Sequence, residues 1–309
     1  MKNVTLRQLR VLVAVARQQG ITRAAEELHL TPPAVSMQLK ELEEQVGVPL
    51  FDRSGRAVTL TTTGEYLLSY ARRILATLKD AEDAMARLRG LQGGTLTIGM
   101  VSTAKYFLPR LIAAFHAEHP GIDMKLRVGN REQLVALMQR NEVDLAVMGR
   151  PPKEWATRAE PFAMHPHVLV TAPDHRFATL ERVPADALAH EGFIVREPGS
   201  GTRAALDEFF AEHHLAPRVL MEMDSNETIK QAVMAGMGVS MLSLHTVGIE
   251  LAHGLIATPE VEGLPLVRRW HVVNNQAKLL APAAEAFRYF VLERGERFLA
   301  GMFPPPVGR

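Results

Sequence analysis

The spacing of apolar residues changes near residue 90, and this change restricts the chain to folds with two unlike parts. Before residue 90, apolar residues recur every three or four positions, which is typical of helices that bury one face. After it, short apolar runs alternate with amphipathic stretches, the pattern of strands joined by helices in a largely parallel sheet. The stretch GLQGGT at residues 90–95 separates the two parts, and its glycines favour a hinge.

Three helices are predicted within the first fifty residues. Thr5 and Gln8 have the spacing of a capping box, and the helix that they begin is predicted to stop at Gly20. A second, shorter helix is expected to start at Thr22, and a third at Thr31 after a brief turn. Helix, turn and helix in this order form a motif that can place its second helix in the major groove of DNA.

The third helix opens with TPPAVSMQLKELE, residues 31–43. Thr31 is a favourable N-cap, and prolines in the first turn cost no helical hydrogen bond because the N–H groups there have no acceptor within the helix. Val35, Leu39 and Leu42 recur at helical steps and predict a buried face. The other side can reach base edges and phosphates, although polar residues are also normal on a solvated helix surface. It carries Ser36, Gln38 and Lys40.

A hairpin is predicted after the third helix. Apolar segments around VPLFDR and AVTLT flank Ser54 and Gly55, which indicates a tight turn between two strands. Arg53 and Arg56 on this hairpin could contact the minor groove or the DNA backbone. Basic residues outnumber acidic ones only slightly over residues 1–60, so the placement of the arginines matters more than the net charge.

One long helix is expected next. Thr62 and Glu65 have the spacing of a second capping box. From Leu67 to Leu88, apolar residues recur at three- and four-residue steps, which predicts a helix of about 25 residues, longer than most helices of globular proteins. Such a length suggests a partner helix, so we expect a homodimer formed through it.

The rest of the chain predicts an α/β fold with two lobes. Residues 95–149 read as three strands separated by two helices. A second set begins at HVLVTAP and continues through FIVRE, RVLMEM and VSMLS to a final helix at residues 282–298. We therefore expect a DNA-binding domain at 1–62, a linker and dimerisation helix at 63–90, and a two-lobed effector-binding domain at 91–309.

Polar residues gather where the predicted strands end. The segment VREPGSGTR at 195–203 leads into a helix whose free N–H groups favour an anion, although a strand-to-helix connection without a ligand can carry the same glycines. Ligands of open α/β sheets collect at the carboxyl ends of the strands, and hydroxyls, an amide and arginines there suit an anionic metabolite. Each residue taken alone is more often a helix cap. The candidate effector-binding residues are Ser102, Thr103, Asn130, Arg131, Gly149, Arg150, Thr202, Arg203, Asn226 and Thr228.

The sequence gives no support for catalysis or metal binding. Cysteine is absent, which excludes disulfides, thiolate metal sites and cysteine nucleophiles. Pro198 stands where a nucleophile elbow around Ser200 would need glycine, and no nucleotide-binding glycine loop is present. The histidines of HPH at 165–167 and HH at 213–214 lack the carboxylates of a metal site. We expect no metal, no cofactor and no enzymatic activity.

Net charge does not decide whether the protein binds a polyanion, but the hydropathy pattern indicates its cellular compartment. The net charge is +1, so it neither requires nor excludes a polyanionic partner. Arginines interrupt the N-terminal apolar run, and no small-residue cleavage site follows it. No stretch approaches the roughly 18 apolar residues that a membrane span needs. We expect a cytoplasmic protein without a membrane partner.

Residues AAEELHLTPPAVSMQLKELE, with the tail LF-x-R and LT-x-x-G, resemble the winged helix-turn-helix of LysR-type transcriptional regulators, without a gap from about residue 5 to residue 68. The remainder is similar to the same family, whose members have a linker helix and two lobes like those of periplasmic binding proteins. The resemblance implies operator DNA as a partner and a tetramer made of two dimers. It places along the major groove Thr31, Pro32, Pro33, Ser36, Gln38 and Lys40, and on the wing Arg53 and Arg56.

Within this family, MGRPP, REPGSGTR and SNETIKQAVMAGMGVSMLS resemble the branch that controls Calvin-cycle, or RuBisCO, operons of autotrophic bacteria. That branch implies a phosphorylated or otherwise anionic effector, such as ribulose bisphosphate, phosphoenolpyruvate or a reduced nicotinamide nucleotide. REPGSGTR also resembles regulators of sulfur and cysteine metabolism, so this pathway remains an alternative. A bilobal solute-binding protein is a different class, but it would need an export signal and would have no use for a helix-turn-helix.

Overall fold

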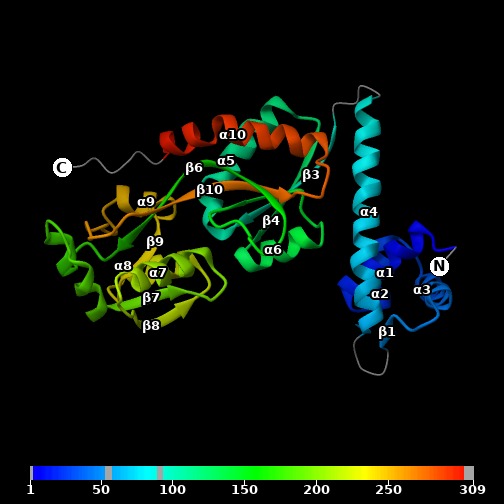
Figure 1. Ribbon diagram of the computed structural model, residues 1–309, viewed down its shortest axis with the longest axis horizontal. Coiled ribbons are helices and arrows are strands. Elements are labelled where there is room, and N and C mark those ends of the chain that lie inside the picture. Colours follow the sequence, from blue (N-terminus) through cyan, green and yellow to red (C-terminus); the bar gives the residue numbers. More distant parts are fainter. Residues whose placement is uncertain (1–2, 53–57, 89–92, 303–309) are drawn as a thin grey trace. The chain divides into compact units, whose positions relative to one another are not determined.

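The computed structural model of the chain describes residues 3–52, 58–88 and 93–302. The chain divides into two compact units, residues 1–90 and residues 91–309, which are coloured blue to cyan and green to red in Figure 1. Within the described ranges, no helix is both long enough and apolar enough to cross a membrane.

The first unit combines a bundle of helices with a two-stranded hairpin (Figure 1). Its elements are α1 (Leu6–Gln18), α2 (Ile21–Leu28), α3 (Pro32–Val46), β1 (Phe51–Asp52), β2 (Thr59–Leu60) and α4 (Thr62–Leu88). The strands β1 and β2 are antiparallel, with Phe51 opposite Leu60. This order confirms the predicted helix-turn-helix followed by a hairpin, while Ser54 and Gly55 at the predicted turn lie outside the described residues.

Two of the predicted caps are confirmed. Thr5 and Gln8 form a capping box, in which each side chain accepts the backbone N–H of the other at 3.2 and 2.9 Å. Thr31 is the N-cap of α3, and its hydroxyl accepts the backbone N–H of Ala34 at 3.4 Å. Because the prolines occupy the first turn of α3, they displace no hydrogen bond within the helix.

The boundary between α1 and α2 differs from the prediction by one residue on each side. Gln19, not Gly20, ends α1, because Gln19 adopts a left-handed conformation with φ of 50°. Gly20 is the N-cap of α2, which begins at Ile21 instead of Thr22. An extended backbone at Gly20 (φ −172°) lets the chain turn directly from one helix into the next.

The start of the long helix α4 also differs. Thr61 caps it, because the Thr61 hydroxyl accepts the backbone N–H of Gly64 at 3.0 Å. Thr62 is already the first residue of the helix, so the predicted capping box of Thr62 and Glu65 is wrong by one position. The helix itself has 27 residues, close to the predicted length.

The core of the first unit follows the predicted periodicity. Val35, Leu39 and Leu42 of α3 are fully buried and pack with residues of α1, α2 and the start of α4. Ala24 and Ala25 of α2 are buried as well, and their small side chains allow neighbouring helices to approach closely. The buried face of α3 therefore fixes which of its sides remains exposed.

The first lobe of the second unit contains a parallel βαβαβ arrangement, as predicted. The strand β3 pairs in parallel with β4 and with β5. Aliphatic residues of the strands and aromatic residues of the covering helices form the core, where the rings of Phe115 and Phe287 lie 5.1 Å apart. The elements are β3 (Gly94–Val101), η1 (Ser102–Tyr106), α5 (Leu108–Glu118), β4 (Ile122–Gly129), α6 (Arg131–Gln139), β5 (Leu145–Met148) and the C-terminal α10 (Pro282–Met302).

The second lobe contains a parallel strand pair covered by helices. Its elements are η2 (Arg176–Thr179), η3 (Ala185–His190), β7 (Gly192–Arg196), α7 (Gly201–Glu212), β8 (Arg218–Met223), α8 (Asn226–Met234), β9 (Ser240–Ser243), η4 (Leu244–Thr246) and α9 (Gly248–Ala252). The strands β7 and β8 are parallel, and a bridge between Phe193 and Val239 joins β7 to the start of β9. Two apolar clusters form its core.

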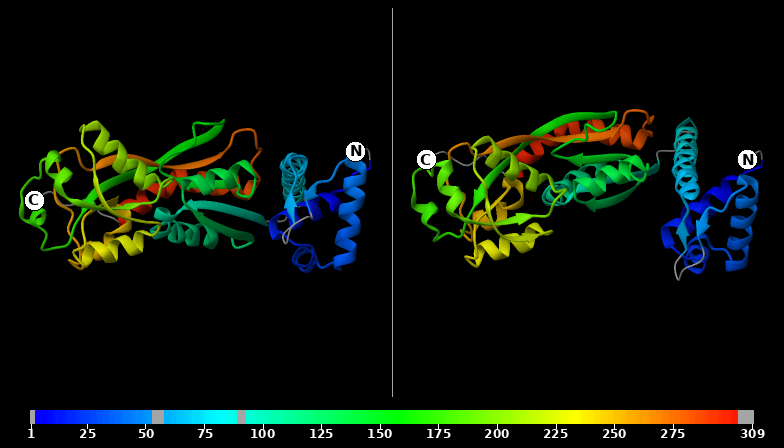
Figure 2. Two further views of the ribbon diagram at one scale, coloured as in Figure 1. Left: turned by 90° about the horizontal axis from the view of Figure 1, so that it is seen from below. Right: turned by 60° about the horizontal axis from the view of Figure 1, so that its bottom comes forward.

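Two long strands join the lobes, β6 (Thr157–Val170) and β10 (Leu266–Asn275), which Figure 2 shows running along the second unit. They pair with each other antiparallel, and β10 also pairs antiparallel with β5 while β6 pairs antiparallel with β9. The six-stranded sheet has the order β4-β3-β5-β10-β6-β9 and is mixed, so the expectation of a largely parallel sheet is wrong for its second half.

Candidate functional site

One candidate site is the exposed side of α3. Thr31, Pro32, Pro33 and Lys40 are exposed, whereas Ser36 and Gln38 are half-buried. The amide of Gln38 donates to a carboxylate oxygen of Glu41 at 3.2 Å, and the buried Gln8 of α1 donates to the same oxygen at 3.2 Å. This bond holds Gln38 in a defined orientation at the edge of the exposed side. Arg53 and Arg56 of the predicted wing lie outside the described residues.

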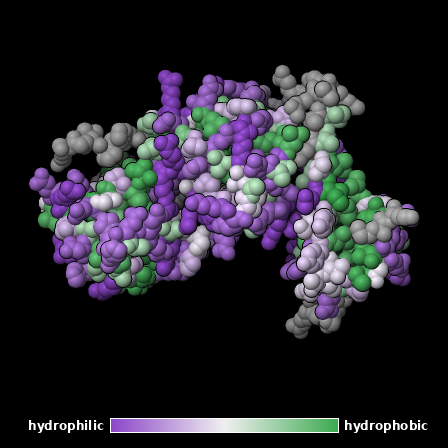
Figure 3. Space-filling model, viewed as in Figure 1, coloured by the Kyte–Doolittle hydropathy of each residue, from purple (hydrophilic) through white to green (hydrophobic). Residues whose placement is uncertain are grey.

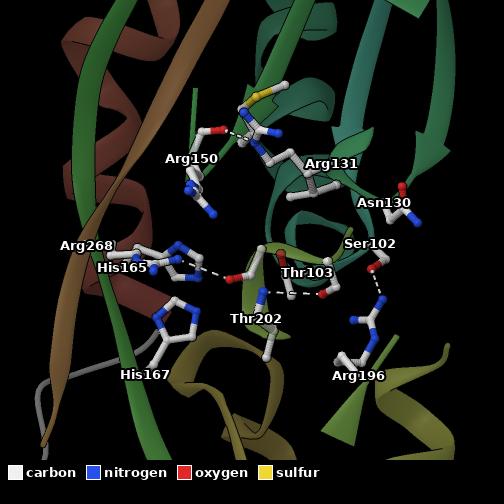
Figure 4. A pocket seen from close by; sticks show the side chains of 15 residues that line it. Ser102, Thr103, Asn130, Arg131, Arg150, His165, His167, Arg196, Thr202 and Arg268 are labelled. Atoms are coloured by element: carbon white, nitrogen blue, oxygen red, sulfur yellow. Dashed lines mark hydrogen bonds between the residues drawn. The ribbon is translucent and has the colours of Figure 1, made fainter. Parts of the chain in front are cut away.

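A second candidate site is a pocket between the two lobes of the second unit, shown in Figure 4. Its volume is about 410 Å³, counted with the open space at its mouth. Residues of both lobes and of the crossing strands line it. They are Val101, Ser102, Thr103, Asn130, Arg131, Met148, Gly149, Arg150, His165, His167, Arg196, Ser200, Gly201, Thr202 and Arg268.

Three helix beginnings meet at this pocket. Ser102 and Thr103 begin η1, Asn130 is the N-cap of α6, and Ser200 is the N-cap of α7, where its hydroxyl accepts the backbone N–H of Thr202 at 3.2 Å. The first N–H groups of a helix have no acceptor within the helix and carry a partial positive charge. The pocket therefore presents backbone donors as well as hydroxyl groups to an anion.

Four arginines give the pocket a positive character. Arg131 donates to the carbonyl oxygen of Arg150 at 2.9 Å, and Arg268 donates to the carbonyl oxygen of Gly201 at 3.1 Å. Three of the four guanidiniums pair with carboxylates that lie outside the lining: Arg131 with Glu154, Arg196 with Glu197, and Arg268 with Glu208. Within the described part of the chain, the guanidinium of Arg150 has no carboxylate partner, and no carboxylate side chain lines the pocket. This arrangement favours an anionic ligand.

Two histidines of β6 form a buried part of the pocket wall. Burial lowers the pKa of His165 well below its ordinary value and lowers the pKa of His167 to about 3, and nearby positive charge acts in the same direction. His165 stacks on Trp270 at a ring distance of 3.8 Å, and Trp270 donates its N–H to His245 at 3.0 Å. No cluster of three or more His, Cys, Asp or Glu side chains that could hold a metal occurs in the described ranges.

The structure brings seven of the ten candidate effector-binding residues together at the pocket: Ser102, Thr103, Asn130, Arg131, Gly149, Arg150 and Thr202. Arg203 lines an adjoining outer pocket instead, where it is paired with Asp207 and Glu222. Asn226 lies behind the wall and accepts a hydrogen bond from Arg196 at 2.6 Å. Thr228 is exposed and lines neither pocket.

Sequence reasoning missed the part of the lining that comes from the crossing strands. His165, His167 and Arg268 lie on β6 and β10, and Arg268 is directly opposite His165 although about a hundred residues separate them. Arg196 was also missed, even though it lies within the VREPGSGTR segment. Its position at the carboxyl end of β7 is the signal that could have identified it.

A helix-turn-helix unit joined to a bilobal unit with a cationic pocket defines a DNA-binding regulator that responds to a ligand. Residues 6–65 match the model of the bacterial regulatory helix-turn-helix proteins of the lysR family, and residues 89–296 match the LysR substrate binding domain. The chain belongs to the LysR family of bacterial transcriptional regulators.

Its relatives carry names that refer to carbon fixation. The chain is 50% identical to the transcriptional regulator CfxR of Cupriavidus necator, over 97% of this chain and 94% of that one. It is 46% identical to the RuBisCO operon transcriptional regulator of Allochromatium vinosum, over 96% and 98%. The regulatory domain of Synechocystis CcmR in complex with 2-PG (2-phosphoglycolate) is 40% identical, covers 65% of this chain and 96% of that one, and has a TM-score of 0.63.

Proposed function

We propose that this LysR-family regulator controls carbon-fixation genes and responds to a small anionic metabolite bound between the lobes. The observation that carries the effector assignment is the pocket itself, which joins four arginines to three helix beginnings and has no carboxylate among its described lining residues. The names of the relatives support the regulated pathway and favour carbon fixation over sulfur metabolism. A solute-binding protein does not account for the helix-turn-helix match.

The DNA-binding half of the proposal uses α3 and α4. The rigid, exposed start of α3 is suited to the major groove. On α4, Tyr66, Tyr70 and Ile74 are exposed one helical turn apart, and Figure 3 shows apolar residues along this helix. Such a stripe supports a homodimer through α4, and two dimers would make the family's tetramer. A regulator that binds chromosomal DNA works in the cytoplasm.

The effector would act by changing the balance between two arrangements of the lobes. Direct contacts now join the lobes beside the pocket: Arg196 donates to Ser102 at 3.3 Å, and Asn130 donates to Glu197 at 3.4 Å. An anion bound in the pocket would compete with Ser102 and Glu197 for the donor groups of Arg196 and Asn130. Its differential affinity for the two arrangements sets how far it can shift the equilibrium.

Arg150→Ala tests the effector site. We expect this variant to bind 2-phosphoglycolate about ten- to hundredfold more weakly than the unmodified protein, because a hydrogen bond to a charged group is worth about 1.5–3 kcal/mol. Isothermal titration calorimetry measures the affinity. Arg218→Ala, which removes an exposed arginine away from the pocket, is the control. Equal affinities for all three proteins would overturn the assignment of the pocket.

Gln38→Ala tests the DNA surface. We expect the preference for operator over unrelated DNA to fall about ten- to hundredfold, because a bidentate contact between an amide and a base is worth about 1–3 kcal/mol. A binding titration at fixed salt measures this ratio, and circular dichroism checks that the helices persist. Glu44→Ala, at the other end of α3, should retain the preference. A variant of Gln38 that still discriminates fully would contradict the proposed orientation of α3.

A further inference from the structure

His165 and His167 have an unusual environment for buried polar side chains. Both are at least nine-tenths buried, with exposed fractions of 4% and 1%. Within the described part of the chain, all four of their ring nitrogens are buried and have no hydrogen-bond partner. The two rings are neighbours, 4.3 Å apart, and both lie in the wall of the pocket between the lobes (Figure 4).

Packing alone does not explain two histidines at these positions. A buried polar group without a partner destabilises a fold, whereas an apolar side chain of similar size would not. His165 is also tightly enclosed, since a Cβ atom at Gly149 would lie only 2.5 Å from its Nδ1. Unpartnered polar groups in a binding pocket indicate that their partner is a ligand.

We propose that His165 and His167 are specificity-determining residues that each donate one N–H hydrogen bond to oxygen atoms of the bound effector. This inference rests on the proposed function of the pocket. Arginines already supply the charge for one anionic group, so the histidines would read a second oxygen-bearing group of the same molecule. The ligand class is then a phosphorylated small acid or sugar, in preference to a simple phosphate ion.

The charges around the pair support neutral rings that act as donors. The charged and titratable groups that face them are the guanidinium of Arg268 and the imidazoles of His245 and His271, none of which supplies negative charge. The backbone of His165 and of Leu266 also faces the His167 ring and acts to raise its pKa, but burial outweighs this effect. Burial and these neighbours lower the pKa of both rings, so each ring is neutral at physiological pH, with one N–H donor and one acceptor nitrogen. Neutral donors can bind an oxygen without the cost of burying another charge.

The arrangement also couples binding to movement. Protein atoms cover the four nitrogens, so a ligand reaches them only when the pocket wall shifts. Gly149 forms the wall beside His165 and directly follows β5 of the first lobe, whereas His167 pairs with Ser243 of β9 in the second. A ligand that binds both histidines would therefore stabilise an arrangement of the lobes that differs from the present one.

The decisive variants are His165→Leu and His167→Leu in the full-length protein, with His165→Gln and His167→Gln as variants that retain an N–H donor. Calorimetry in phosphate-free buffer compares two probes, 2-phosphoglycolate and inorganic phosphate. We expect each leucine variant to bind 2-phosphoglycolate at least tenfold more weakly and inorganic phosphate within twofold of the unmodified protein. The glutamine variants should recover much of the difference. The thermal midpoint of the leucine variants should be unchanged or higher, because an unpartnered polar group has been removed.

A purely structural role predicts the opposite pattern, a lower midpoint with equal losses for both probes, and that result would overturn the inference. If the leucine variants do not fold, ¹⁵N-histidine spectra of the unmodified protein decide. Ring N–H signals that move when 2-phosphoglycolate is added support the proposal, and signals that stay fixed at saturation refute it. If Arg150→Ala loses binding and the histidine variants do not, only this inference fails. If the unmodified protein binds neither probe, both this inference and the proposed class of effector are refuted.

Discussion

Gly64→Ala is expected to weaken operator binding at least tenfold while leaving effector binding intact. Gly64 lies in the first turn of α4, where alanine normally favours a helix. Here, however, its Cβ would lie 2.0 Å from the backbone oxygen of Leu50 and 2.9 Å from a side-chain carbon of Leu60. A backbone atom cannot move aside as a flexible side chain can. The methyl group must therefore push the hairpin away from α4.

This displacement would break the local hydrogen bonds as well. The same Leu50 oxygen accepts the backbone N–H of Thr61 at 3.0 Å, next to the pairing of β1 with β2. We expect the first unit to lose about 1–3 kcal/mol of stability, the usual cost of overpacking. DNA binding by fluorescence anisotropy should then fall at least tenfold.

Gly20→Ala is a matched control for this prediction, since the nearest atom to its added Cβ would be 3.7 Å away, an ordinary contact. It should retain DNA binding, because the added methyl group has room and alanine in place of a glycine N-cap costs only about 1 kcal/mol of helix stability. Calorimetry with 2-phosphoglycolate should give equal affinities for both glycine variants. Normal DNA binding by Gly64→Ala would show that the contact between hairpin and helix is unimportant.

Local signals in the sequence predicted the DNA-binding unit well. The start and the buried face of α3 are both determined by residues close together in the sequence. Thr31 and the two prolines mark its start, and the spacing of Val35 and Leu39 marks its buried face. The errors at Gln19 and Thr61 are single-residue shifts at helix ends, where a sequence pattern defines the boundary only to within one or two residues. The glycine of the LT-x-x-G tail was recognised as a pattern, but only the structure shows the close backbone approach that requires it.

The effector pocket was predicted only where it follows strand ends. Ser102, Thr103 and Asn130 come directly after or at such ends, so chain order alone indicated them. The contribution of β6 and β10 depends on an antiparallel pairing between distant segments, and Pro161 and Pro166 weaken the strand pattern of β6 ahead of HVLV. The register between strands far apart in sequence is set by tertiary packing. It cannot be predicted from the local pattern of residues alone.

Acidification from pH 7 to pH 5 is expected to destabilise the second unit strongly. Burial lowers the pKa of His165 well below its ordinary value, that of His167 to about 3 and that of His245 to about 4. In the unfolded chain these rings regain a pKa of about 6.5 and bind protons that the folded state excludes. The contribution of these three rings to stability is therefore constant above about pH 7 and falls as the pH drops below 6.5.

Each of these rings should contribute about 1.4 kcal/mol per pH unit within that window, so the three together cost roughly 6 kcal/mol by pH 5. Both tryptophans, Trp155 and Trp270, belong to the second unit, so their fluorescence in urea titrations reports on this unit alone. His167→Gln removes one titrating ring and should reduce the loss between pH 7 and pH 5 by about a third. A pH dependence equal to that of the unmodified protein would contradict this prediction, because it would mean that His167 becomes protonated in the folded state. The same measurement with bound 2-phosphoglycolate would then show whether the ligand assists that protonation.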